Sequence, residues 1–233
     1  MVMDLLQAAA GRGVPVGAAS GPARTVGRLS LYRRILYGLS EASVDNVYSH
    51  DLARMAGSTA AQVRRDIMGL GHTGSPVHGY NVRELIDAIG QVLDAEGGQC
   101  AALVGVGNLG RAIIAYFASR RPRLAIVAGF DSEPGKVGRV IHGCHCYPVA
   151  ELGRVVRERG VSVGIVTVPA EQAQDVAELL VAAGVRGLLN FAPVRLTVSP
   201  EVYVEDVDIT TSLERVAYFS RVDAGSQRRD GRP

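Results

Sequence analysis

The chain has 233 residues, 47% of them hydrophobic, which is enough to build the core of one or two domains. Its net charge of +2 does not by itself indicate a nucleic-acid-binding protein, and an odd number of cysteines, three, is typical of a reducing compartment. The start, Met-Val-Met-Asp, lacks the basic residues of a signal peptide, and no apolar run reaches the roughly 18 residues of a membrane span, so we expect a cytoplasmic protein without a membrane partner.

Residues 1–21 are rich in alanine and glycine and show little hydrophobic pattern, so we expect a mobile N-terminal arm. From Pro22 onward, apolar residues recur at the spacing of one helix face. These positions are Val26, Leu29, Leu31, Tyr32, Ile35, Leu36 and Leu39. The pattern predicts a long first helix.

Two short helices separated by a glycine are predicted next. Ser49 is the candidate N-cap of a helix over residues 50–56, which Gly57 ends, and Ser58 or Thr59 is the candidate N-cap of the helix that follows. The expected inward positions are Leu52, Met55 and Ala56 in the first helix, and Val63, Ile67 and Met68 in the second. A helix, a tight turn with glycine and a second helix are the layout of a helix-turn-helix.

The second of these helices, over residues 59–70, is the candidate DNA-reading helix. Its first turn is small and polar, and long hydrogen-bonding side chains extend from the face away from the core, as contacts to bases and phosphates require. The candidate DNA-binding residues are Thr59, Ala60, Gln62, Arg64 and Arg65. Before residue 81 the chain has eight basic and five acidic residues, a difference of +3. The alternative is a helical cap whose arginines are merely solvated.

Residues 69–79 are rich in turn-forming residues and are consistent with a small hairpin or wing. A helix over residues 82–96 then joins this region to the second half of the chain, where strands and helices alternate. The expected strands lie at about residues 99–105, 124–130, 161–167, 185–190 and 202–207, with helices at about 109–120, 148–159 and 170–183. This order predicts an α/β fold with a doubly wound parallel sheet.

The first strand of that sheet ends in a glycine fingerprint that opens a helix, Gly105-Val106-Gly107-Asn108-Leu109-Gly110. Such a turn points backbone N–H groups and the positive end of the helix at a pyrophosphate. The next strand ends in Asp131, about 20 residues on, where an acid holds the ribose hydroxyls of NAD. The alternative is a glycine turn in another α/β domain, including one that binds coenzyme A.

Three other features remain. Residues 211–222 are predicted to form an amphipathic helix with Leu213, Val216, Ala217 and Phe219 on its apolar face, which needs a partner in its own domain or in a neighbouring subunit.

Strand-like alternation in Cys144-His145-Cys146 would put both sulfurs on one face. No histidine or cysteine follows residue 146, so we expect free thiols and no metal, although a redox role for the pair stays open.

An NAD-dependent oxidoreductase is the main alternative function. Hydride transfer needs an acid or base beside the nicotinamide. After the fingerprint the only histidines are His142 and His145, Lys136 is the only lysine in the chain, and no Tyr-x-x-x-Lys pattern occurs. We therefore name no catalytic residue and expect a protein that is not an enzyme.

Taken together, the motifs resemble the Rex family of redox-sensing transcriptional repressors. The matching segments span residues 22 to 223, and Gln-Val-Arg-Arg-Asp with Asn-Phe-Ala-Pro are more specific than the glycines. The segments are Leu29 to Leu36, Gln62 to Asp66, Gly79 to Val82, Gly105 to Gly110, Phe130-Asp131, Lys136 to Gly138, Thr167 to Pro169, Leu189 to Pro193 and Val204 to Asp208.

The resemblance implies a winged-helix DNA-binding domain joined to a Rossmann domain that binds NAD(H). It implies a homodimer with a swapped C-terminal helix, which binds near-palindromic double-stranded operator DNA and releases it when NADH binds. The nucleotide site would comprise Gly105, Val106, Gly107, Asn108, Leu109, Gly110, Asp131, Lys136, Thr167, Val168, Pro169, Asn190, Phe191, Ala192 and Pro193. The switch would pair Arg34 with Asp208 of the partner subunit.

On this basis the chain is divided into an arm (1–21), a winged-helix domain (22–80), a linking helix (81–98), a Rossmann domain (99–208) and a C-terminal helix with its tail (209–233). One departure from the family lies in the wing, where Pro76 or a neighbour occupies the position of the usual arginine. A wing without that cation loses a minor-groove contact, so affinity or sequence preference is expected to differ. A coenzyme-A-binding Rossmann protein would share the topology but would not need Gln62 to Asp66.

Overall fold

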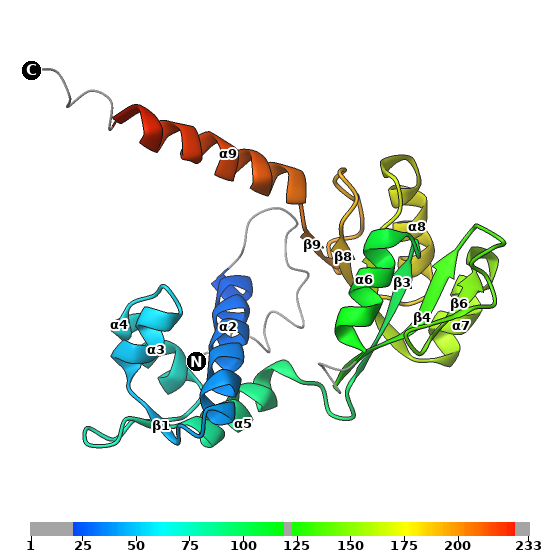
Figure 1. Ribbon diagram of the computed structural model, residues 1–233. Coiled ribbons are helices and arrows are strands. Elements are labelled where there is room, and N and C mark those ends of the chain that lie inside the picture. The colour runs from blue at the N-terminus through cyan, green and yellow to red at the C-terminus, as the bar shows by residue number, and fades with distance from the viewer. Residues whose placement is uncertain (1–20, 119–122, 227–233) are drawn as a thin grey trace, which may run out of the picture. The chain divides into compact units, whose positions relative to one another are not determined.

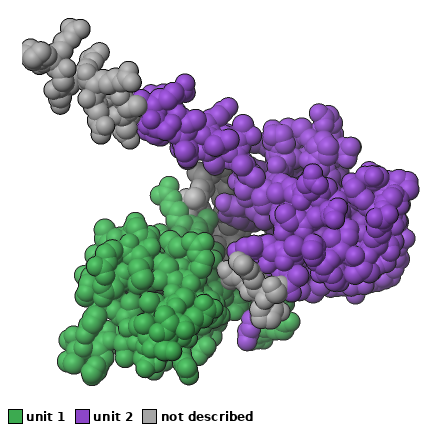
Figure 2. Space-filling view, in the orientation of Figure 1, with its two compact units in different colours: residues 1–99 green, residues 100–233 purple. Residues whose placement is uncertain are grey.

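The computed structural model describes residues 21–118 and 123–226, and the chain divides into two compact units, residues 1–99 and 100–233 (Figures 1 and 2). The arm expected over residues 1–21 lies outside the described residues, apart from Gly21. Within the described ranges, none of the helices has the length and apolar character needed to cross a membrane.

The first unit is built from helices around one apolar core. Its elements are α2 (Gly21–Glu41), β1 (Asn46–Val47), α3 (Ser49–Met55), α4 (Ala60–Gly69), β2 (Tyr80–Asn81) and α5 (Val82–Leu93). The core joins all four of these helices: Leu29, Tyr32 and Leu36 of α2, Leu52 of α3, Val63 and Ile67 of α4, and Val82, Leu85 and Ile89 of α5. Helix α5, expected as a connection between domains, thus packs its apolar face into the first unit.

Two details of the short helices differ from the expectation. Ser49 is the first residue of α3 and does not cap it; the N-cap is Tyr48, whose side chain makes no capping hydrogen bond. The Ser49 hydroxyl is used elsewhere, because it accepts a hydrogen bond from Arg64 Nη1 at 3.0 Å. Met55 is exposed, and Ala53 takes the inward position beside Leu52.

The cap and the hairpin that follow agree with the sequence. Thr59 caps α4, and its Oγ1 accepts a hydrogen bond from the backbone N–H of Gln62 at 3.2 Å. Ser75 and Gly79 exchange two backbone hydrogen bonds of 2.8 Å, which makes residues 75–79 a small hairpin. Met68, expected inward, is exposed because it lies one position past the buried Ile67.

The second unit contains a seven-stranded sheet. Its elements are β3 (Gln99–Val104), α6 (Asn108–Phe117), β4 (Leu124–Asp131), β5 (Val140–Ile141), β6 (Cys144–Pro148), η1 (Val149–Glu151), α7 (Leu152–Glu158), β7 (Val161–Val166), α8 (Ala170–Ala182), β8 (Gly187–Asn190), β9 (Tyr203–Asp206) and α9 (Ile209–Ser226). The strand order is β5-β6-β4-β3-β7-β8-β9. Without the antiparallel edge strand β5, this is the 3-2-1-4-5-6 order of a dinucleotide-binding fold.

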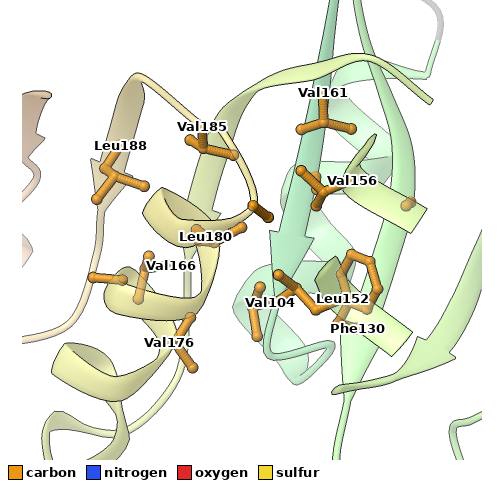
Figure 3. Packing of buried hydrophobic residues seen from close by; sticks show 14 of the residues in the cluster. Val104, Phe130, Leu152, Val156, Val161, Val166, Val176, Leu180, Val185 and Leu188 are labelled. Atoms are coloured by element: carbon orange, nitrogen blue, oxygen red, sulfur yellow. The ribbon is translucent and has the colours of Figure 1, made fainter. Parts of the chain in front are cut away.

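Helices cover both faces of this sheet. On one face Val104, Phe130 and Val166 pack with Leu152 of α7 and Leu180 of α8 (Figure 3). On the other face Ala101 and Leu103, whose side chains alternate with those of Ala102 and Val104 along β3, pack with Ile114 of α6. The expected doubly wound sheet is therefore present. The strand that contains Cys144 and Cys146 also has both sulfurs on one buried face.

Helix α9 follows β9 and differs from the other helices in its surroundings. Every side chain from Ile209 to Arg221 is exposed, including the apolar Leu213, Val216 and Phe219. Packing within its own domain, one of the two expectations for this helix, is therefore absent from the described chain. Its apolar face has no cover there.

Candidate nucleotide and nucleic-acid sites

The glycine fingerprint between β3 and α6 forms a tight turn. Gly105 has a φ of +98°, which favours glycine, and its N–H donates to the Phe130 carbonyl at 2.8 Å. A Cβ on Gly105 would lie 2.6 Å from the Thr167 carbonyl oxygen, and a Cβ on Gly110 would collide with the Gly105 carbonyl oxygen. Two of the three glycines are thus required by close packing of the chain on itself.

The third glycine lies beside open space. Gly107 is the N-cap of α6, and no described atom lies within 4 Å of the place a Cβ would take. The first N–H groups of a helix have no intrahelical acceptor, and Gly107, which has no side chain, cannot supply one. The backbone from Gly107 to Gly110 therefore presents donors and a positive helix end, the arrangement that binds a phosphate.

Asp131 holds the fingerprint turn from the end of β4. Its carboxylate is buried, and it accepts hydrogen bonds from the Val106 N–H at 2.9 Å, the Glu133 N–H at 2.9 Å and Lys136 Nζ at 3.2 Å. Lys136 also lies 2.8 Å from a Glu133 carboxylate oxygen, and hydrogen bonds to Glu133 and Asp131 raise the pKa of its ammonium. The Val106 N–H is therefore directed at Asp131 and is not available to a phosphate.

The segment after β7 lies against the fingerprint. The Thr167 hydroxyl lies 3.0 Å from the Val104 carbonyl oxygen and 2.9 Å from that of Gly105, and its one proton is shared between these two acceptors. The Val168 side chain would be 2.9 Å from a Cβ on Gly105, and Pro169 is the N-cap of α8. The structure thus brings Thr167 and Val168 together with the glycine turn, as the sequence-based site requires.

The segment after β8 has a different character. Asn190 is buried, and its amide nitrogen donates to the Val194 carbonyl at 2.7 Å and to the Asp206 carboxylate at 2.8 Å. Its amide oxygen accepts from the Ala192 N–H at 3.0 Å. These contacts use the side chain to shape the loop from Phe191 to Pro193. Asn190 is therefore placed to support the loop with both of its amide protons, while its amide oxygen keeps one lone pair beyond the bond from Ala192.

The candidate DNA-reading helix α4 exposes two arginines. Arg64 Nη1 donates to the Ser49 hydroxyl at 3.0 Å, and Arg65 Nη1 donates to the Gln62 side-chain oxygen at 3.2 Å. The opposite face of α4 is in the core, through the buried Val63 and Ile67, and Ala60 is partly buried against the same core. Of the five expected DNA-binding residues, Arg64 and Arg65 are the two cations, and both are exposed.

A buried carboxylate in the same helix escaped the sequence analysis. Asp66 accepts hydrogen bonds from Arg28 Nε at 2.7 Å, Arg28 Nη2 at 2.8 Å, the Tyr32 hydroxyl at 3.1 Å and Gln62 Nε2 at 2.9 Å. The hydrogen bond that Arg28 donates to Asp66 raises the pKa of the Arg28 guanidinium, and burial raises the pKa of Tyr32. The sequence feature that could have indicated a buried acid is the position of Asp66 in this helix, directly before the inward Ile67 and four residues after Gln62.

The two expected switch residues lie in different units. Arg34 is exposed on α2, whereas its neighbour Arg33 is buried with Nη1 2.7 Å from an Asp94 oxygen. Asp208 caps α9, because its carboxylate accepts from the Thr211 N–H at 2.8 Å and the Thr211 hydroxyl at 2.5 Å. These hydrogen bonds lower the pKa of Asp208. Asp208 is therefore charged and accessible at neutral pH.

The cysteines are free thiols. Cys144 and Cys146 are buried, and burial raises the pKa of Cys144 to about 11 and that of Cys146 in the same direction. A thiol with a raised pKa is a poor nucleophile and a poor metal ligand. Across residues 21–118 and 123–226, no three histidine, cysteine or acidic side chains gather into a possible metal site.

Comparison with known proteins gives matches over both units. The family model described as CoA binding domain matches residues 99–194, and the one described as Putative DNA-binding protein N-terminus matches residues 22–67. The redox-sensing transcriptional repressor Rex of Carboxydothermus hydrogenoformans is 43% identical over 202 residues, which cover 87% of this chain and 97% of that protein.

Solved structures match over the same length. The crystal structure of RSP in complex with beta-NAD+ and operator DNA has a TM-score of 0.79 and 28% sequence identity, covering 92% of this chain and 97% of that one. The structure of RSP in complex with beta-NADH has a TM-score of 0.77, also at 28% identity, covering 92% of this chain and 99% of that one.

Proposed function

The chain belongs to the Rex family of redox-sensing transcriptional repressors, and from this premise we propose how its residues carry out repression and sensing. The protein is a regulator and not an enzyme: it binds operator DNA, and NAD(H) is its ligand. The observation that carries the proposal is that one chain contains both a fingerprint turn whose helix α6 has no side-chain cap among the described residues and a helix, α4, that exposes two arginines.

The nucleotide site is proposed at the carboxyl ends of β3, β4, β7 and β8. The pyrophosphate lies at the N–H groups of Gly107 to Gly110, where the backbone is open. Asp131 is proposed to play two parts: it fixes the turn through Val106, and its carboxylate would accept a hydrogen bond from the adenosine ribose when the nucleotide is bound. Val168, Pro169 and the loop from Phe191 to Pro193 form the side of the site that faces the nicotinamide half.

Preference for NADH over NADPH is part of the proposal. Asp131 and Glu133 bring two carboxylates to the end of β4, and the single ammonium of Lys136 lies between them. The local charge therefore stays negative, and a 2′-phosphate would be repelled there. NADH and NADPH should accordingly differ in affinity by calorimetry, and equal affinities would contradict this assignment.

The DNA site is proposed on α4, with Thr59 and Ala60 at the end that approaches the duplex and Arg64 and Arg65 as its cations. The protein acts as a homodimer on near-palindromic DNA, so that two copies of α4 reach two half-sites. The exposed apolar face of α9 supports exchange of this helix between subunits, because Leu213, Val216 and Phe219 have no cover within the described chain.

The switch is proposed to depend on Arg34 and Asp208 of the partner subunit, paired when NADH is bound. NADH can lower operator affinity only if it binds two subunit arrangements unequally, and an ion pair made in one of them supplies such a bias. We propose a winged-helix domain over residues 22–80 and a Rossmann domain over residues 99–208; the linking segment 81–98 includes α5, which packs on the core of the first unit. We place the protein in the cytoplasm, where operator DNA and NAD(H) are both present.

One experiment tests the function as a whole. Labelled DNA from the region upstream of the protein's own gene is titrated with the protein alone, with NADH and with coenzyme A. In a separate assay, absorbance at 340 nm is followed with NAD+ and candidate alcohols or with NADH and candidate ketones. We expect tight binding, release on addition of NADH and no turnover. Steady oxidation of NADH would support the oxidoreductase alternative, and release by coenzyme A but not by NADH would support the coenzyme-A alternative.

A further inference from the structure

Gln62 lies between a buried carboxylate and an exposed arginine of the same helix. Its side-chain nitrogen donates to Asp66 Oδ1 at 2.9 Å, and its side-chain oxygen accepts from Arg65 Nη1 at 3.2 Å. We propose that Gln62 and Asp66 are positioning residues that hold Arg65 for DNA, in a relay anchored on α2 through Arg28. This inference rests on the proposed function of α4, and it gives Gln62 a role other than direct reading of bases.

The direction of the relay is set by its buried end. A carboxylate can only accept hydrogen bonds, and Asp66 receives two from the Arg28 guanidinium, at 2.7 and 2.8 Å, and one from Tyr32 at 3.1 Å. Gln62 must therefore turn its nitrogen toward Asp66, which leaves its oxygen toward Arg65. A glutamine amide has two possible orientations, and here the acid selects the one that offers Arg65 an acceptor.

The consequence concerns the order of the Arg65 side chain. A guanidinium has five N–H donors, so one bond to Gln62 leaves the others free for a base edge or a phosphate. A side chain that is already held loses less rotamer freedom when DNA binds. Arg64 provides a contrast, because it is held by the Ser49 hydroxyl of α3 and not by the relay. The two arginines of α4 are thus held by different helices.

The test compares variants of the full chain for binding to operator and to random DNA at one salt concentration. Gln62→Met keeps the length of the side chain and removes both hydrogen bonds. We expect operator affinity to fall about fivefold, the size of one lost side-chain hydrogen bond. Random-DNA affinity should change less than about twofold, because the charge is unchanged. Gln91→Met, on an exposed position of α5, is the matched control and should change neither.

A double-mutant cycle separates positioning from direct contact. In an Arg65→Ala background, Gln62→Met should have no further effect, whereas in an Arg64→Ala background its fivefold effect should persist. Asp66→Asn should also lower operator affinity, because an asparagine amide has only one acceptor atom and cannot accept from both sides of the Arg28 guanidinium, which loosens the buried end of the relay. Thermal unfolding shows whether this last variant folds. If it does not fold, the cycle of Gln62→Met with Arg65→Ala still tests whether Gln62 acts through Arg65.

The possible outcomes distinguish a failure of the proposed role of Gln62 from a failure of α4 as the DNA-binding helix. Equal losses from Gln62→Met with and without Arg65 would show that Gln62 contacts DNA itself, and unchanged operator affinity for Gln62→Met would show that it has no role; either result overturns the relay. If Arg64→Ala and Arg65→Ala both left operator affinity intact, α4 would not be the reading helix, and the proposed DNA site would fail whatever Gln62 does.

Discussion

The two units of this protein hold their functional groups in different ways. In the first unit, side-chain hydrogen bonds hold the functional groups. The buried Asp66 accepts hydrogen bonds from Arg28, Tyr32 and Gln62, and it thereby determines which groups α4 exposes. In the second unit, close backbone packing adds to such side-chain contacts: Gly105 and Gly110 let the turn approach its neighbours more closely than any side chain permits. Side-chain contacts can be altered in small steps, whereas Gly105 and Gly110 have no room for an added atom.

The net charge of the first unit does not explain attraction to DNA. Residues 21–99 contain eight arginines, no lysine and eight acidic residues, so their formal charge is zero. Two of the acids, Asp66 and Asp94, are paired with Arg28 and Arg33 at 2.7 Å. Attraction to DNA therefore depends on where individual arginines are held and not on an overall positive field, and for that reason the geometry of Arg64 and Arg65 matters.

The largest effect is expected at Gly105. Gly105→Ala would place a Cβ 2.6 Å from the Thr167 carbonyl oxygen at a φ of +98°, so both crowding and backbone strain oppose it. We expect a loss of about 3 kcal/mol in the free energy of unfolding, measured with urea. Gly107→Ala, with open space around its Cβ, is the control and should cost less than about 1 kcal/mol. Equal losses would contradict the assignment of the two glycines.

The side-chain network should be next in size. Asp66→Ala removes the acceptor of Arg28, Tyr32 and Gln62 and leaves the mostly buried guanidinium without its partner. We expect the first unit to lose about 2 kcal/mol, because Arg28 retains some contact with water. Asp87→Ala, an exposed acid on α5, is the matched control. If both variants unfold at the same urea concentration, the network does not stabilise this unit.

A smaller effect is expected at Asp208, where capping and ion pairing can be separated. Asp208→Asn keeps a good N-cap and removes the charge, while Asp208→Ala removes both. If the charge pairs with Arg34, both variants should need several-fold more NADH to release the operator. Release blunted only in Asp208→Ala would assign the residue to the cap alone.

The cap also has a pH dependence of known sign. The pKa of Asp208 is lowered in the folded chain by the hydroxyl and N–H of Thr211. Its contribution is therefore fully present above the ordinary carboxyl pKa of 3.8 and is lost as the pH falls through the lower folded value. The difference in circular dichroism between wild type and Asp208→Ala should vanish only in that acidic range.

The smallest effect is expected at the buried thiols. Because burial raises the pKa of Cys144 to about 11, Cys144 and Cys146 should resist a thiol reagent at pH 8 in the folded protein and react after denaturation. The partly exposed Cys100 serves as the internal reference. Rapid labelling of Cys144 in native protein, located by mass spectrometry, would reopen a redox role for the pair.

The sequence predicted well the features that are determined by residues close together in the chain. The strand, glycine turn and helix around Gly105 were predicted because each glycine acts within a few residues of its place in the chain. The alternation of strands and helices gave the doubly wound sheet for the same reason. The cap at Thr59 depends only on Gln62, three residues on.

What the sequence did not predict depends on partners far along the chain. Asp66 counted as an acid and as the end of the Gln62 to Asp66 motif, but nothing local shows that Arg28, 38 residues earlier, is its partner. Ser49 was expected to cap a helix, but its hydroxyl accepts from Arg64, 15 residues away. Asn190 was predicted as a ligand residue, and only the fold shows that Asp206 and Val194 occupy its amide.

The most direct test of NADH sensing measures DNA binding by the first unit while NADH binds to the second. Operator affinity is followed across an NADH titration for the wild type and for Gly107→Ala, which adds one methyl group where the pyrophosphate is expected. The account predicts equal operator affinity without NADH, release of the wild type as NADH rises, and about tenfold more NADH for the same release of Gly107→Ala. Release of both proteins at one NADH concentration, or no release of the wild type, would contradict it.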